Sequence, residues 1–173
     1  YHPKGDVLLK RPVIFFNHGG AFYAGDKSSQ DCIDFCTEFA KKGYVAVSLN
    51  YRLANPILFL TDKKVQLTTV LQSMADVKAA LRFFVKDAKN TNQYRVDTTA
   101  FFVGGYSAGA VASLHTAWVK SETELDANLK DLLKVFFEDT HVSFIIISPL
   151  CSLSNPAIER KIVLLPRSNY YAS

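Results

Sequence analysis

The strongest chemical pattern in the sequence is a serine flanked by small residues. Residues 105–109 read Gly-Tyr-Ser-Ala-Gly, directly after the apolar run 101–103 and directly before a helical pattern. A serine on so tight a strand-to-helix turn takes a strained backbone conformation, and small flanking residues such as Gly105 and Gly109 leave room for it. The helix that follows favours negative charge beside Ser107. The pattern predicts a nucleophilic serine, although an isolated match of this kind also occurs in ordinary turns.

A second loop could donate hydrogen bonds to the same reaction. Residues 18–22 read His-Gly-Gly-Ala-Phe and follow an earlier apolar run. Backbone N–H groups aimed at a carbonyl oxygen stabilise the developing oxyanion, and each contributes about 2.7–4 kcal/mol. Two N–H groups of this loop and that of Ala108 would make a three-donor oxyanion hole. Alone, the loop is better explained as a turn around a structural His18. Together, the two motifs favour the oxyanion hole.

Apolar runs of strand length alternate with helical patterns along the chain. The strand-like runs are residues 12–16, 44–49, 100–103 and 142–148, and residues 161–166 could add a short strand. The helical patterns cover residues 32–39, 67–84 and 125–136, the last as a packed surface helix or, alternatively, a mobile lid. The runs lack polar alternation, which indicates strands covered on both faces. We therefore predict an α/β fold with an open, mostly parallel sheet flanked by helices.

The composition limits the class of protein. The 173 residues are 49% hydrophobic and 21% charged, which is typical of one globular domain that buries about 70% of its surface. The net charge of +4 is spread along the chain, so nucleic-acid binding is disfavoured. Three cysteines cannot all pair, and Cys32 and Cys36 lie one helical turn apart, so we expect free, mostly buried thiols. No run is long enough to span a membrane, and residues 1–10 lack a signal peptide's apolar stretch.

With these motifs in order, the sequence resembles the carboxylesterases and hormone-sensitive-lipase-like esterases of the α/β-hydrolase superfamily, including the feruloyl and acetyl esterase branch. The likeness covers about residues 1–150. It is carried by residues 18–22 with 25–26, 43–45 with 50–53, 76 with 79–83, and 96–97 with 104–110. The resemblance implies an α/β-hydrolase fold, here one partial domain over residues 1–173.

The resemblance also implies roles for individual residues. Ser107 would be the acylated nucleophile, and the oxyanion donors would be the amides of Gly20, Ala21 and Ala108. Residues with a framework role would be His18, Gly19, Gly105 and Gly109, with Tyr51–Leu53 and Asp76 holding the fold. Tyr106 and Phe22 would lie near the acyl site. The expected partner is a small-molecule ester, without metal, organic cofactor or nucleic acid. Many relatives are exported, so secretion or a periplasmic location is expected for a full-length parent. The sequence does not indicate an oligomeric state.

The remaining members of a catalytic triad are harder to place. In this superfamily an acid and then a histidine follow the serine, but residues 149–173 contain Glu159 as their sole acid and no histidine. His115 lies about 12 Å from Ser107 along one helix. Asp139 and His141 begin the fourth strand-like run, which in a parallel sheet puts them roughly 20 Å away. We therefore expect a chain incomplete at both ends, as a fragment or a product with an altered reading frame or stop.

Three functional hypotheses follow. The first is hydrolysis of carboxylic esters through an acyl-enzyme on Ser107, nearly inactive in this chain because it lacks a base. The second is a non-catalytic, degenerate hydrolase that acts as a binding module. The third is a membrane-surface lipase with a lid, which would need a strongly amphipathic helix near the pocket, and residues 125–137 match only partly.

Overall fold

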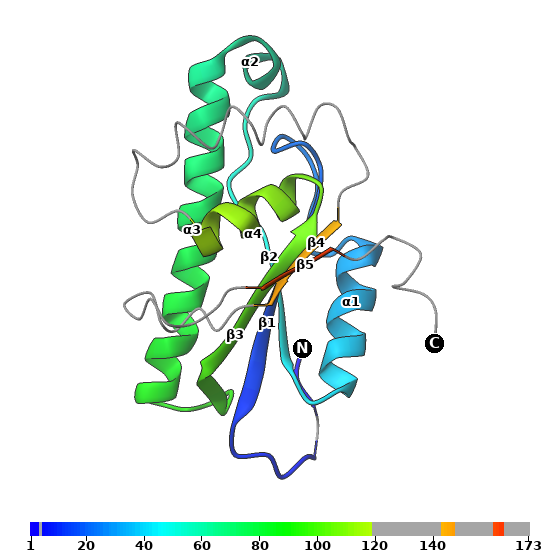
Figure 1. Cartoon of the computed structure of the whole chain (residues 1–173), viewed down its shortest axis with the longest axis vertical. Helices are drawn as coiled ribbons and strands as arrows, with labels where there is room; N and C mark the ends of the chain where they lie inside the picture. Colours follow the sequence, from blue (N-terminus) through cyan, green and yellow to red (C-terminus); the bar gives the residue numbers. More distant parts are fainter. Residues whose placement is uncertain (4, 119–142, 148–160, 165–173) are drawn as a thin grey trace.

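The structure is a computed structural model that describes residues 1–3, 5–118, 143–147 and 161–164, with the last two segments described as backbone strands (Figure 1). In chain order the elements are β1 (Arg11–Asn17), α1 (Gln30–Lys41), β2 (Val45–Leu49), α2 (Pro56–Thr61), α3 (Lys63–Lys89), β3 (Val96–Tyr106), α4 (Ala108–Trp118), β4 (Ser143–Ile147) and β5 (Lys161–Leu164). They form one sheet in the order β2-β1-β3-β4-β5. The predicted α/β architecture is confirmed. The predicted helix at 125–136 and Cys151 lie outside the described residues.

The sheet is built around β1, which pairs in parallel with β2 on one side and β3 on the other. Its last residue, Asn17, lies opposite Leu49 of β2 and Gly105 of β3. The carboxyl ends of β1 and β3 therefore meet at one edge of the sheet. The loop after β1 and the serine after β3 leave from that edge, where parallel α/β sheets place their sites.

The fourth strand differs from what the sequence argument assumed. β4 runs antiparallel to β3, with Ser143 opposite Tyr106, and β5 runs antiparallel to β4. The start of β4 thus lies at the edge that carries Ser107, not at the opposite edge. The premise behind the 20 Å separation deduced for Asp139 and His141, a fourth strand parallel to the others, was wrong, because an apolar run fixes a strand but not its direction. Both residues themselves lie outside the described residues.

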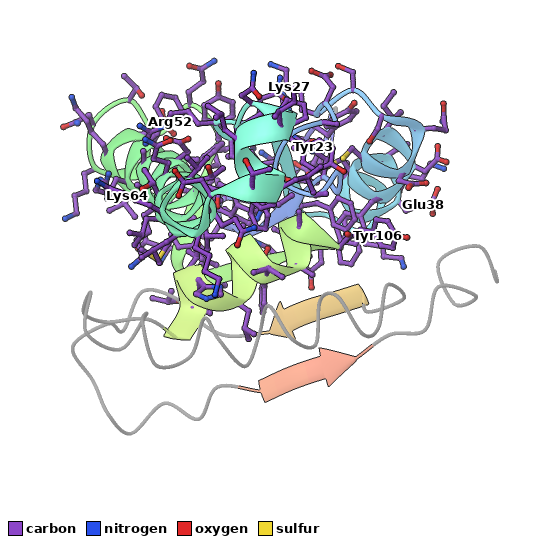
Figure 2. All side chains as sticks on the ribbon, turned by 90° about the horizontal axis from the view of Figure 1, so that it is seen from above. Tyr23, Lys27, Glu38, Arg52, Lys64 and Tyr106 are labelled. Carbon is purple, nitrogen blue, oxygen red and sulfur yellow. The ribbon has the colours of Figure 1, made fainter. Side chains whose placement is uncertain are left out.

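Helices cover both faces of the sheet, with α1 on one face and α3 and α4 on the other (Figures 1 and 2). Alternate side chains of β1 pack against the helices on the two opposite faces of the sheet. Ile14 and Phe16 pack with Cys32, Phe35 and Cys36 of α1. Val13 and Phe15 pack on the opposite side with Val77 and Phe84 of α3 and Ala117 of α4. Burying a large apolar side chain of this kind stabilises the fold by about 1.5–3 kcal/mol. The two-sided burial explains why the run showed no polar alternation.

Local sequence signals set the ends of the helices that follow β2. The Asn55 side chain accepts hydrogen bonds from the N–H groups of Ile57 and Leu58, and Pro56 opens α2. Asp62 ends α2 and accepts from the Lys64 N–H to begin α3. Such caps satisfy backbone donors that a helix start leaves unpaired. Sequence analysis did not predict α2. No helix in the described part of the chain is long and apolar enough to cross a membrane.

Candidate active site

Ser107 stands alone in the sharp turn between β3 and α4. Its φ is +53°, in the left-handed region, which costs a non-glycine residue roughly 1–2 kcal/mol. Its carbonyl oxygen accepts from the N–H groups of Ala110 and Val111 at 2.9 and 3.1 Å, so the helix begins on the serine itself. The strained turn leaves the Ser107 side chain half-buried at the N-terminal end of α4.

The turn around Ser107, residues 105–109, is called the elbow below, and its two glycines make room for the end of β1. A Cβ on Gly109 would lie 2.0 Å from the Asn17 carbonyl oxygen and 2.4 Å from the His18 carbonyl oxygen. A Cβ on Gly105 would lie 2.5 Å from the same Asn17 oxygen. These separations are shorter than real Cβ contacts, so a side chain at either position would force α4 and the end of β1 apart. The close approach brings the start of the second loop against the serine turn.

The loop after β1 has an unusual backbone. Gly20, Ala21 and Phe22 all have positive φ, at 120°, 52° and 65°, and the Gly20 carbonyl accepts from the N–H groups of two following residues, Tyr23 and Ala24. Within the described chain, the N–H groups of Gly20, Ala21 and Ala108 donate no hydrogen bond to another residue. Amides without a protein partner are available to a negatively charged oxygen.

The loop and the serine turn are in direct contact. A Cβ on Gly19 would lie 3.3 Å from the Ser107 Cβ and 2.9 Å from the Tyr106 Cδ1. The structure therefore brings the loop bearing the predicted donors Gly20 and Ala21 beside the predicted nucleophile. The amide of Ala108 follows the serine on the same turn.

Tyr51 contacts the first residue of the loop 18–22 through its hydroxyl and its ring. Its hydroxyl donates to the His18 carbonyl oxygen at 2.7 Å, and its ring stacks on the imidazole with centroids 4.4 Å apart. The His18 Nδ1 lies 2.7 Å from the Gly19 carbonyl oxygen, an arrangement in which the ring N–H donates. Burial raises the pKa of Tyr51, so the phenol remains a neutral donor. The resemblance had assigned a framework role to both residues.

Aromatic packing fixes the far end of the loop. Phe22 is fully buried, and its ring centroid lies 5.9 Å from that of Phe59 in α2. The Phe22 carbonyl oxygen accepts a hydrogen bond from the Ala54 N–H at 2.8 Å. Tyr23 also contacts Phe59 and lies beside α2 (Figure 2). Sequence analysis missed Phe59, although the Asn-Pro pair before it was a signal for a helix start.

Two polar clusters secure neighbouring segments. The Arg52 guanidinium and backbone N–H both bond the Asp76 carboxylate at about 3 Å, which ties the end of β2 to α3. Asp26 accepts from the Asn50 side chain and from the Ser28 N–H, each at 2.8 Å. These hydrogen bonds lower the pKa of Asp26, the Asn50 bond most of all. The positions singled out by the resemblance therefore hold loops in place.

The histidines in the described part of the chain are not placed to take a proton from Ser107. His115 is buried in α4 with its Nδ1 2.7 Å from the Val111 carbonyl oxygen, and burial lowers its pKa. It is packed, as predicted. The His18 ring is stacked on Tyr51, and His2 lies at the exposed start of the chain beside Tyr94. His141 lies outside the described residues.

The described residues contain no group of three or more histidine, cysteine, aspartate or glutamate side chains that could hold a metal ion. Cys32 and Cys36 are free and buried, as predicted. Burial raises the pKa of Cys36 to about 12, which keeps that thiol protonated. The half-buried Ser107 and the amides around it are the groups that could do chemistry at this edge.

Comparison with known proteins gives three kinds of match. The family model BD-FAE matches residues 1–149. Gut esterase 1 from Caenorhabditis briggsae is 31% identical over 106 residues, which are 61% of this chain and 18% of that protein. Gut esterase 1 from Caenorhabditis elegans is 29% identical over 106 residues, which are 60% of this chain and 17% of that protein.

Among solved structures, a C6-C4 SN3 inhibited esterase B from Lactobacillus rhamnosis is similar, with a TM-score of 0.51 at 22% sequence identity. The likeness covers 73% of this chain and 36% of the esterase chain, and it confirms the α/β-hydrolase fold. The matched part of the chain spans less than a fifth of the length of the two gut esterases.

Proposed function

The chain belongs to the BD-FAE family of esterase-like α/β hydrolases, and from that membership we propose that Ser107 is the nucleophile of a carboxylic ester hydrolase. The observation that carries the proposal is the contact between the two loops. A left-handed serine at the start of α4 lies against a loop in which the N–H groups of Gly20 and Ala21 donate no hydrogen bond to another described residue. Acyl transfer needs a nucleophile and oxyanion donors within one site.

The proposed reaction has two halves. In the first, the Ser107 Oγ attacks the ester carbonyl carbon, its proton passes to a base, and the carbonyl oxygen becomes an oxyanion. The amides of Gly20, Ala21 and Ala108 donate to that oxygen, and collapse of the intermediate breaks the ester C–O bond while the base returns the proton to the leaving oxygen, which departs as the alcohol. In the second, water attacks the acyl-enzyme and releases the carboxylic acid, which restores the serine.

The base is the part of the site that the described residues do not supply. His18 is stacked on Tyr51 and His115 is enclosed in α4. Without a base the serine hydroxyl is a weak nucleophile, and the oxyanion hole alone retains only a residual rate. We expect slow turnover by the 173 residues and a gain when a soluble base is added.

The test is hydrolysis of p-nitrophenyl acetate and butyrate by the full chain, with and without added imidazole. Ser107→Ala is the key variant, and Ser28→Ala is the matched control, since Ser28 is an exposed serine outside both loops. Gel filtration first establishes that all three proteins are compact. Imidazole is small enough to accept the proton that a triad histidine would take.

After the rate of ester hydrolysis by imidazole alone has been subtracted, we expect imidazole to raise the remaining rate at least about 10-fold in the full chain and in the Ser28 control, but not in Ser107→Ala. Mass spectrometry should find the acyl group on the peptide containing Ser107. A rate unchanged by Ser107→Ala in both conditions would refute the proposal. Rapid turnover without imidazole that disappears in His141→Ala would keep the nucleophile and place the base within the chain.

A further inference from the structure

A buried hydrogen bond links the strand before the oxyanion loop, residues 18–22, to the helix after the nucleophile. The Asn17 Nδ2 at the end of β1 donates to the Ser113 Oγ in α4 at 2.8 Å. Both residues have no exposed surface. Neither residue was singled out by the sequence motifs, although Asn17 stands directly before residues 18–22 and Ser113 lies six positions after Ser107.

Ser113 also contacts the strand that leads to the nucleophile. Its Oγ lies 2.8 Å from the Gly104 carbonyl oxygen in β3 and 2.7 Å from the Gly109 carbonyl oxygen in α4. The single hydroxyl proton can be donated to either carbonyl, while the oxygen accepts from Asn17. One buried side chain therefore joins β1, β3 and α4, the three elements from which both site loops depart.

The backbone of Asn17 is confined at the same point. Its carbonyl oxygen fits between Gly105 and Gly109, where a Cβ on either glycine would come within 2.5 Å. Steric contact limits how close β1 can come to the elbow, and the Asn17–Ser113 bond limits how far it can move away. Together they fix the end of β1 relative to the elbow.

The energetics favour a geometric role for this pair. The Asn17 Oδ1 is buried and has no hydrogen-bond partner among the described residues, and an unsatisfied buried acceptor costs about 1–3 kcal/mol. Two apolar side chains of similar size would fill the space without that cost. The polar pair instead fixes the relative position of β1 and α4, because a hydrogen bond weakens steeply when its angle or length departs from the optimum.

We propose that Asn17 and Ser113 are positioning residues that hold the amides of Gly20 and Ala21 in register with Ser107. This inference rests on the proposed ester hydrolysis. The oxyanion donors come from two loops, and a displacement of about 1 Å between them costs on the order of 100-fold in rate. Loss of the Asn17–Ser113 hydrogen bond allows the two loops to shift relative to each other. This shift reduces the stabilisation of the transition state more than it reduces the binding of the ester.

The test compares Ser113→Ala, Asn17→Ala and their double variant with the full chain, assayed on p-nitrophenyl butyrate with imidazole present. Thr116→Val is the matched control. Thr116 is also buried in α4 and its hydroxyl donates to the Ala112 carbonyl at 2.8 Å, but it makes no bond to β1. Thermal unfolding is measured for every variant, together with kcat and KM.

We expect each single variant to lower kcat about 10- to 100-fold with KM within about 3-fold, and the double variant to be no worse than the poorer single one. Thr116→Val should retain kcat within about 3-fold. If only one of the two single variants folds, the proposal is tested by comparing the kcat of that variant with the kcat of Thr116→Val.

Other outcomes would overturn the proposal. These are kcat losses equal to that of Thr116→Val, strictly multiplicative losses in the double variant, or unfolding of both single variants while Thr116→Val stays folded. Turnover that survives Ser107→Ala would refute the proposed function and this inference together. A Ser107-dependent rate that is indifferent to Asn17 and Ser113 would refute the positioning role alone.

Discussion

Replacing Gly109 by alanine sets two opposing effects against each other. Gly109 lies in the first turn of α4 and its φ is not positive, so alanine adds no backbone strain and on helix propensity alone would stabilise the protein by up to about 1 kcal/mol. The added Cβ, however, would lie 2.0 Å from the Asn17 carbonyl oxygen and 2.4 Å from that of His18. Ordinary C···O contacts are about 3.3 Å or longer, so α4 and β1 must separate by roughly 1 Å.

Overpacking of this kind costs about 1–3 kcal/mol, and both obstructing atoms belong to backbone that cannot rotate away. We therefore expect Gly109→Ala to be less stable by about 1–2 kcal/mol, and Tm to fall by roughly 2–8 °C. The same separation moves the oxyanion loop from Ser107, so the Ser107-dependent esterase rate should drop about 100-fold.

The assay is thermal unfolding by circular dichroism together with ester hydrolysis. Ala79→Gly is the matched control, because Ala79 is exposed within α3, and it measures the helix-propensity effect of the same pair of residues without a clash. It should cost about 1 kcal/mol and leave the rate unchanged. A Gly109→Ala protein with a Tm at or above that of the parent, and an unchanged rate, would refute the close approach of α4 and β1.

Three further predictions concern stability and reactivity. Cys36, with its pKa raised to about 12, should resist alkylation by iodoacetamide at pH 8 until guanidinium unfolds the chain, as followed by mass spectrometry. Tyr51→Phe removes the hydroxyl that donates to the His18 carbonyl and should destabilise the protein by about 1–2 kcal/mol in chemical denaturation. The Arg11 guanidinium donates hydrogen bonds to the Asp6 carboxylate, and these bonds lower the pKa of Asp6. Asp6→Asn should therefore lower Tm at pH 7, and the difference should shrink as the pH falls below about 4, where the parent carboxylate also gains a proton; a difference independent of pH would contradict this.

Much of the fold could be predicted from local patterns. The runs at 12–16 and 44–49 became β1 and β2 with shifts of one residue at the ends, since short apolar runs next to turn residues are strong strand signals. β3 begins at Val96, four residues before the predicted start. Val96 is part of the core, but the residues that join it to the apolar run, residues 97–99, are polar, so hydrophobicity alone did not reveal the start of the strand.

The site was predicted only in part, for a similar reason. Residues of a motif, such as Ser107 and the loop 18–22, are recognised because their spacing is local. The Asn17–Ser113 bond joins positions 96 residues apart, and no periodicity or motif within either segment indicates that they meet. The direction of β4 was missed likewise, because strand direction depends on the path of the connecting chain.

The pairing of Asn17 with Gly105 also determines when the site can form during synthesis. The ribosome adds roughly 5–20 residues per second, so the loop at residues 18–22 emerges several seconds before the turn at Ser107. In that interval β1 can pair with β2, but its other edge, destined for β3, stays open. An unpaired apolar edge is the part of a nascent chain most prone to associate. Translation that stalls between the two motifs would leave that edge exposed to pairing with other chains.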